Sequence, residues 1–148
     1  MLDLALRLAI LAGVCVLIWF AVGIGRYFVE RQRRQALAAE PLAIATTENA
    51  QTNGPHVSIL VFSSDDCRQC HTMQHPALER LLHARQEQVT VIDVDAVAEH
   101  VLTERYKVLT LPTTVVLDGT GNVQAVNYGF ATTQRLLEQV DAVLAHVN

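Results

Sequence analysis

The apolar positions of this chain form one long uncharged run, followed by short segments with the periodicity of strands and helices. Residues 8–25 contain no charged side chain. As a helix, with a rise of about 1.5 Å per residue, this run spans roughly 27 Å, close to the hydrocarbon thickness of a bilayer. A helix that is apolar on every face is rare in a small soluble domain. The run therefore predicts an N-terminal transmembrane helix.

A cleaved signal peptide is the alternative for this segment. The run is long for the apolar part of a signal peptide, the next stretch is heavily charged, and the small residues at 36–39 come late for a cleavage site. We therefore expect residues 1–40 to form an uncleaved anchor with a basic juxtamembrane helix. Residues 41–54 lack apolar periodicity and are expected to form a flexible linker.

Flanking charge predicts how the anchor is oriented. Arg26, Arg31, Arg33 and Arg34 follow the run, whereas Arg7 is the only basic side chain before it. Basic residues concentrate on the cytoplasmic side of membrane spans. We therefore expect a single-pass protein of the cell membrane whose N-terminus lies outside and whose soluble domain is cytoplasmic.

Residues 55–148 have the pattern of one α/β domain. Strands are predicted at 56–62, 88–94, 112–118 and 123–128, and helices at 67–86, at 96–105 and from residue 132 or 133 to about 147. A hairpin turn is predicted at 118–122. This order of elements implies a central mixed sheet with helices on both faces.

The composition of this domain narrows the classes of partner and fold. It carries eleven acidic and six basic residues, a net charge of −5, and has no basic patch with interleaved aromatic residues. Nucleic acid is therefore not an expected partner. Two cysteines are too few for a disulfide-stapled scaffold, so we expect the pair to serve chemistry. Cys15 lies inside the apolar run and is interpreted as a packing residue.

The pair is Cys67 and Cys70, two residues apart where a strand ends and a helix begins. Such a pair can close a small disulfide ring, and the unpaired N–H groups at a helix start favour a thiolate. With His71 the same residues spell Cys-x-x-Cys-His, the attachment motif of a c-type haem. With His71 and His75 they could bind zinc. The local residues alone leave these three chemistries open.

The wider arrangement strongly resembles thioredoxin over roughly residues 55–147. The resemblance rests on residues 61–70, on Leu111, Pro112 and Thr113 at the start of a later strand, and on Gly119 with Gly129. A lone Cys-x-x-Cys is a weak signal. The same motif between a strand and a helix, some forty residues before a proline that opens a strand, is a specific one.

The resemblance implies a thioredoxin-like protein-disulfide oxidoreductase without a cofactor or metal. Cys67 would be the nucleophile and Cys70 the resolving cysteine. Leu111, Pro112 and Thr113 would bind the substrate, with Pro112 as a cis proline beside the cysteines. The expected partners are a protein or small-molecule disulfide and an unidentified redox partner. In a reducing cytoplasm such a protein acts mainly as a reductant.

Several residues depart from the thioredoxin pattern. Val61 stands where the family has a buried aspartate, Asp66 where it has a tryptophan, and Arg68 and Gln69 where it has Gly-Pro. The negative charge of Asp65 and Asp66 opposes a thiolate on the neighbouring cysteine. One of these aspartates is expected to cap the helix start. The departures suggest a specialised oxidoreductase.

The alternative function belongs to a different class, a non-enzymatic module. The domain would then be a redox-inert thioredoxin-like binding module, or a metal- or haem-binding protein that uses Cys67, Cys70, His71 and His75. For His71 itself, a proton-handling neighbour of the cysteines and a solvated surface histidine are both open.

Overall fold

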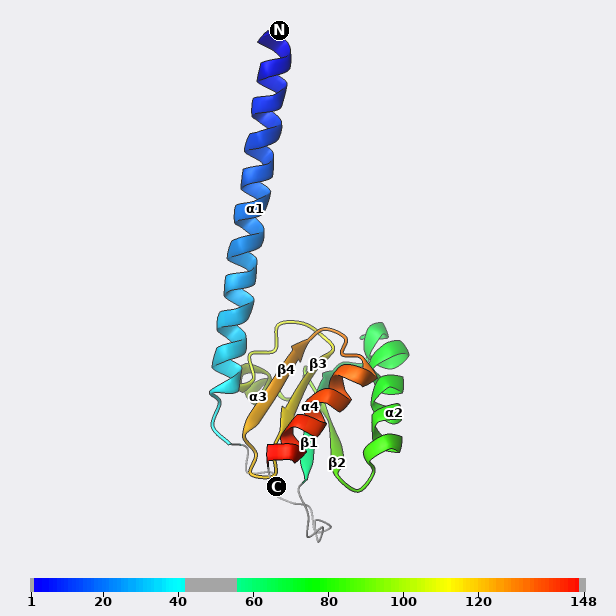
Figure 1. Cartoon of the computed structure of the whole chain (residues 1–148). Helices are drawn as coiled ribbons and strands as arrows, with labels where there is room; N and C mark the ends of the chain where they lie inside the picture. The colour runs from blue at the N-terminus through cyan, green and yellow to red at the C-terminus, as the bar shows by residue number, and fades with distance from the viewer. Residues whose placement is uncertain (1, 42–55, 147–148) are drawn as a thin grey trace. The chain divides into compact units, whose positions relative to one another are not determined.

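The computed structural model describes residues 2–41 and 56–146, and the chain divides into two compact units between Arg34 and Gln35. The first unit is a single helix and the second is an α/β domain (Figure 1). The predicted linker at 41–54 lies outside the described residues, apart from Pro41.

Helix α1, Leu2–Leu37, contains the predicted span. Its part Ile10–Leu37 reaches a mean hydropathy of 1.9 over an 18-residue window, and none of that window is buried. By length and composition this helix is a candidate membrane span, although a signal sequence shares these properties. Tyr27 and Phe28 lie edge to face near the end of the apolar run, with ring centroids 6.3 Å apart.

Four strands form the sheet of the second unit. They are β1 (Val57–Ser63), β2 (Val89–Asp95), β3 (Thr113–Leu117) and β4 (Val123–Tyr128), in the spatial order β2-β1-β3-β4. Strands β1 and β2 are parallel, whereas β3 is antiparallel to both β1 and β4. The predicted mixed sheet is therefore confirmed.

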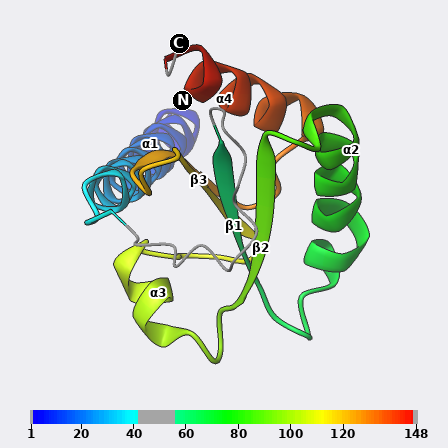
Figure 2. The same ribbon diagram turned by 90° about the horizontal axis from the view of Figure 1, so that it is seen from below.

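Helices cover both faces of this sheet, as predicted. A π-helix, η1 (Cys70–Gln74), runs directly into α2 (His75–Arg85), and the other two helices are α3 (His100–Arg105) and α4 (Thr133–His146). Figure 2 shows α2 and α4 on one face and α3 on the other. Burial of apolar side chains on both faces holds the layers together.

The core consists of two clusters, one on each face of the sheet. β1 supplies side chains to both, because successive residues of a strand point to opposite faces. The members from β1 are Val57, Ile59 and Val61 in the first cluster and Leu60 and Phe62 in the second. The first cluster also holds residues of α2 and α4. The second also holds Tyr106, whose ring centroid lies 6.0 Å from that of Phe62.

The predicted helix at 96–105 begins later than expected, at His100. The reason is a turn after β2, where the backbone N–H groups of Val97 and Ala98 both donate to Asp95 Oδ1, at 2.8 and 3.4 Å. An aspartate that bonds the backbone two residues on favours a turn over a helix. The turn delays α3, whose six residues bury no side chain completely.

The C-terminal helix has the predicted cap. The backbone N–H of Arg135 donates to Thr132 Oγ1 at 3.3 Å, so a threonine hydroxyl satisfies one of the free N–H groups at the helix start. Leu136, Val140, Val143 and Leu144 form its buried stripe.

The predicted hairpin turn at 118–122 is built around the carboxylate of Asp118. Its Oδ1 accepts hydrogen bonds from the backbone N–H groups of Thr120 and Asn122, at 2.9 and 3.0 Å, and its Oδ2 accepts one from Gln124 Nε2 at 2.7 Å. Partial burial opposes the charge, but these bonds together with one from the Thr120 hydroxyl hold the pKa of Asp118 below its ordinary value.

Candidate active site

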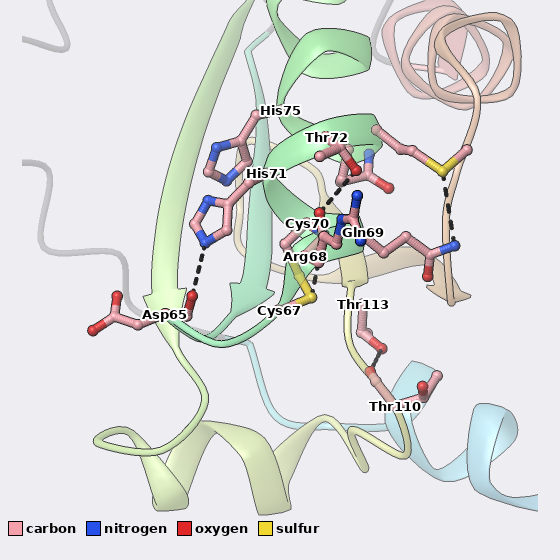
Figure 3. Close-up of a disulfide and its surroundings, with 12 residues drawn as sticks. Asp65, Cys67, Arg68, Gln69, Cys70, His71, Thr72, His75, Thr110 and Thr113 are labelled. Carbon is pink, nitrogen blue, oxygen red and sulfur yellow. Dashed lines mark hydrogen bonds between the residues drawn. A yellow bond between two sulfur atoms is a disulfide. The ribbon is translucent and has the colours of Figure 1, made fainter.

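Cys67 and Cys70 form a disulfide just beyond the end of β1 (Figure 3). Their sulfur atoms are 2.05 Å apart and their Cα atoms 5.3 Å apart. The Cys67 backbone N–H donates to the Ser64 carbonyl at 3.0 Å, which closes the turn that leads from the strand to the helix. The structure thus contains the small disulfide ring that was one of the three chemistries open from the local residues.

The two cysteines occupy different environments. Cys67 is partly exposed, whereas Cys70 is completely buried. The backbone N–H of Cys70 donates to Cys67 Sγ at 3.2 Å. A hydrogen bond from a backbone N–H is stronger when its acceptor is charged. The partly exposed cysteine, Cys67, is therefore also the one whose sulfur accepts a backbone N–H.

This contact replaces the cap expected from Asp65 or Asp66. Among the described residues neither aspartate side chain accepts a hydrogen bond from the helix start, so that expectation is wrong. Cys67 Sγ instead accepts from the N–H three residues on, as the side chain of an N-cap serine does. Cys67 caps the helix in place of an aspartate because it is the residue whose carbonyl accepts the first helical hydrogen bonds.

The helix after the cysteines starts with a π-turn. The backbone N–H of His75 donates to the Cys70 carbonyl five residues earlier, where an α-helix would use a spacing of four. Pro76 follows in the first turn of α2, and because it has no N–H it cannot donate to a carbonyl of η1. The predicted single helix at 67–86 is therefore a π-turn followed by an α-helix. Such π-turns occur frequently at functional sites.

The segment with Pro112 lies at the same end of the sheet as the disulfide. Thr113 opens β3 and pairs with Phe62, close to the end of β1. The Leu111–Pro112 peptide bond is cis, as the resemblance implied. The Thr113 hydroxyl donates to the Thr110 carbonyl at 2.7 Å across this segment (Figure 3). The Pro112 carbonyl accepts from the backbone N–H of Gly129 at 2.8 Å.

Comparison with known families fits this geometry. A family model described as a thioredoxin-like domain matches residues 45–144, which is more than half of the chain. The chain belongs to the thioredoxin-like domain family. No curated protein matches the sequence.

Solved structures of thioredoxins support the same fold. One is thioredoxin-2, a component of malaria parasite protein secretion machinery, with 20% identity and a TM-score of 0.55 over 60% of this chain and 84% of that chain. A chloroplastic thioredoxin z has 21% identity and a TM-score of 0.54 over 61% and 80%. The germline-specific thioredoxin Deadhead of Drosophila melanogaster has 26% identity and a TM-score of 0.53 over 60% and 81%.

The thioredoxin-like domain has an apolar interior behind its disulfide. Val61 is fully buried where thioredoxins have an aspartate. No buried residue in the described part of the chain carries a carboxyl group. Besides Cys70 and Tyr106, the buried residues with polar side chains are the neutral Ser58, Gln74, Thr113, Thr114 and Asn127. Proton transfer to or from the cysteines therefore has no buried carboxylate available among these residues.

His71 and His75 lie on the same side of the helix that starts at the cysteines (Figure 3). Their ring centroids are 5.3 Å apart. His71 Nε2 forms a hydrogen bond with the Asp65 backbone carbonyl at 3.2 Å, and His75 Nε2 lies 3.9 Å from Asp93 Oδ1. Within the described residues, no group of three or more His, Cys, Asp and Glu side chains is arranged to hold a metal ion. The histidine pair therefore has no third ligand for zinc there.

Gln74 is not among the residues that the sequence predicted for the site. This side chain is fully buried in η1, and its amide pairs with the backbone of Ala131. A signal was present in the pattern, because Gln74 follows Cys70 by four residues and precedes Leu78 by four. It is thus a polar residue on the buried stripe of a helix. Such a residue is expected to have a specific hydrogen-bonding partner.

Proposed function

We propose that this chain is a membrane-tethered thiol–disulfide oxidoreductase that acts mainly as a reductant, with Cys67 and Cys70 as its catalytic residues. The observation that carries the proposal is the asymmetry of the disulfide. Cys67 is partly exposed and its sulfur accepts a backbone N–H, while Cys70 is completely buried. That arrangement suits a nucleophile and a resolving cysteine.

The proposed reaction begins with the dithiol form of the protein. The Cys67 thiolate attacks one sulfur of a substrate disulfide, a mixed disulfide forms, and the other substrate sulfur leaves as a thiolate. Cys70, deprotonated, then attacks Cys67 Sγ and releases the second substrate thiolate. Two electrons pass from the protein to the substrate, whose thiolates take up the two protons given up by the cysteines. A dithiol partner restores the reduced form by the reverse exchange.

The segment Leu111, Pro112 and Thr113 is proposed to bind the substrate. The Pro112 carbonyl and the Thr113 hydroxyl both have partners within the domain. Leu111 is partly exposed and lies outside the helices and strands. Its backbone makes no hydrogen bond to any other described residue. Its N–H and carbonyl groups can therefore pair with an extended peptide, as strand-like ligands pair with a sheet edge.

The membrane tether rests on helix α1 and its flanking charges. The candidate span is followed by Arg26, Arg31, Arg33 and Arg34, which favour a cytoplasmic position for the residues after it. In that compartment thiols are kept reduced, so Cys67 and Cys70 would be reduced again after each reaction and would act as a reductant. The proposed partners are a protein or small-molecule disulfide and a cytoplasmic dithiol donor.

The function is tested with the full chain in detergent micelles. Wild type is expected to accelerate the reduction of insulin by dithiothreitol, whereas Cys67→Ser is expected to be inactive because the attacking sulfur is missing. Cys70→Ser that has been reduced and then separated from dithiothreitol is expected to accumulate a mixed disulfide with insulin, which is detected by mass spectrometry. A wild-type rate equal to that of dithiothreitol alone would contradict the proposal.

Direction and orientation need separate measurements. A reductant should have a potential close to the value of about −270 mV known for thioredoxin, while a much higher value would indicate an oxidant. Protease added outside intact cells should leave the domain uncut, because the charge pattern puts it inside. Digestion of residues 56–146 from outside would overturn the proposed orientation.

A further inference from the structure

Gln74 is the only polar residue among the completely buried side chains of η1 and α2. Its neighbours in this buried set are Cys70 on one side and Ala77 and Leu81 on the other. A buried amide without partners would be strongly destabilising, so its hydrogen bonds identify what holds it in place.

Both polar atoms of the Gln74 side chain bind one residue far away in the sequence. The Ala131 backbone N–H donates to Gln74 Oε1 at 2.9 Å, and Gln74 Nε2 donates to the Ala131 carbonyl at 3.3 Å. The side chain thus exchanges two hydrogen bonds with the backbone of one residue, as paired residues of antiparallel strands do. Ala131 is itself almost fully buried, at 1% exposure, so water does not compete for these groups.

The segment held by Gln74 is also bonded to the Pro112 segment. Gly129, two residues before Ala131, donates its backbone N–H to the Pro112 carbonyl at 2.8 Å. Gly129 has a φ of +81°, a conformation that glycine adopts without strain. Hydrogen bonds at the two ends of residues 129–131, joined by the backbone between them, therefore link η1 to the segment proposed to bind the substrate.

We propose that Gln74 is a positioning residue that fixes residues 129–131, and through them Pro112, relative to the cysteine pair. This role rests on the proposed oxidoreductase function. The π-turn carries both Cys70 and Gln74, so the cysteine and the residue that holds the binding segment belong to the same turn. Loss of the amide would let residues 129–131, and with them the Pro112 segment, leave their place at the end of the sheet that carries the disulfide.

A neighbouring contact supplies a matched control. The Thr133 hydroxyl donates to the Ala77 carbonyl at 3.1 Å, so it also joins the segment after β4 to the helix after the cysteines. It lies beyond Ala131 and has no bond to residues 129–131 or to Pro112. Thr133→Val therefore removes a hydrogen bond between the same two regions and leaves the bonds that link η1 to the Pro112 segment intact.

The experiment compares Gln74→Met, Gln74→Glu and Thr133→Val in the full chain, with a peptide disulfide as substrate. If residues 129–131 hold the competent arrangement only about a tenth of the time without the amide, KM rises about tenfold while kcat stays within about twofold. Gln74→Met should show this rise and should lose hydrogen-exchange protection at the Ala131 and Gly129 amides. Thr133→Val should show neither effect.

Gln74→Glu provides a pH-dependent rescue. A protonated carboxyl group has one donor and one acceptor, as the amide does, whereas a carboxylate accepts only. At about pH 5 the KM of Gln74→Glu should approach that of wild type. As the carboxyl group ionises at higher pH, this KM should rise toward that of Gln74→Met, with each variant compared with wild type at the same pH.

The outcomes separate the two proposals. A wild-type chain without disulfide turnover would refute the proposed function, and this role with it. An active wild type whose Gln74→Met variant has an unchanged KM, or a KM raised no more than that of Thr133→Val, would refute the positioning role alone. If Gln74→Met does not fold, the pH dependence of Gln74→Glu decides in the same way.

Discussion

Val61→Asp would place a carboxyl group where thioredoxins have one and where this chain has an apolar interior. Val61 is completely buried on β1, in a cluster with Leu78, Leu81 and Val116. A carboxyl group there is removed from water, which disfavours its charged form. The substitution therefore tests directly whether the interior behind the disulfide is dry.

The expected magnitude follows from the shift in the carboxyl pKa. Burial raises the pKa of a carboxyl group by up to about 3–5 units from about 3.9. With a shift of about three units, the folded state of Val61→Asp stays protonated up to about pH 7 while the unfolded state ionises. Stability then falls as the pH rises. Between about pH 5 and pH 7 the free energy of unfolding should decrease by about 2 kcal/mol.

The assay is urea unfolding of residues 35–148, followed by circular dichroism at both pH values. Val61→Thr is the control, because it has a similar shape and introduces a polar group that does not ionise. Subtracting the control leaves the contribution of ionisation. An equal loss of stability at both pH values would refute the reasoning, since it would mean that the carboxyl group at this position reaches water.

Two further predictions concern the hairpin and the cysteines. The pKa of Asp118 is lowered in the folded state, so its charge stabilises the fold above the unfolded pKa, and this contribution is lost as the pH falls through the folded one. Acid titration should therefore destabilise wild type more than Asp118→Asn below about pH 4; parallel curves would contradict this. In the reduced protein, iodoacetamide should modify Cys67 much faster than Cys70, because only the first is accessible. Equal rates by mass spectrometry would contradict the assigned roles.

Strands were the part of the fold that the sequence predicted best. β4, Val123–Tyr128, has the predicted bounds, and β1 and β2 differ from prediction by one residue at each end. Apolar alternation and flanking turn residues are local signals, so a strand can be recognised without its neighbours. The start of α3 was missed because Asp95, at the end of β2, bonds the backbone after it instead of letting the helix begin.

In the candidate site, too, the sequence predicted local motifs but not the contacts that depend on the backbone geometry or on distant residues. Cys67, Cys70 and Pro112 could be predicted as site residues because each belongs to a short motif with a fixed place in the order of elements. The helix cap was assigned to the wrong residue because Asp66 and Cys67 are adjacent candidates, and only the backbone geometry decides between them. The contact between Gln74 and Ala131 could not be predicted, because 57 residues separate the two and no local pattern marks the partner.

That long separation matters for how the protein is made. A ribosome produces both cysteines, and then Gln74, well before it reaches Ala131. Until then the buried amide has no peptide group to bind and the segment with Pro112 has no support from Gly129. Domains emerge from the N-terminal end and fold as units once enough chain is available. The nascent chain therefore carries two thiols without their finished surroundings until residues 129–131 have been made.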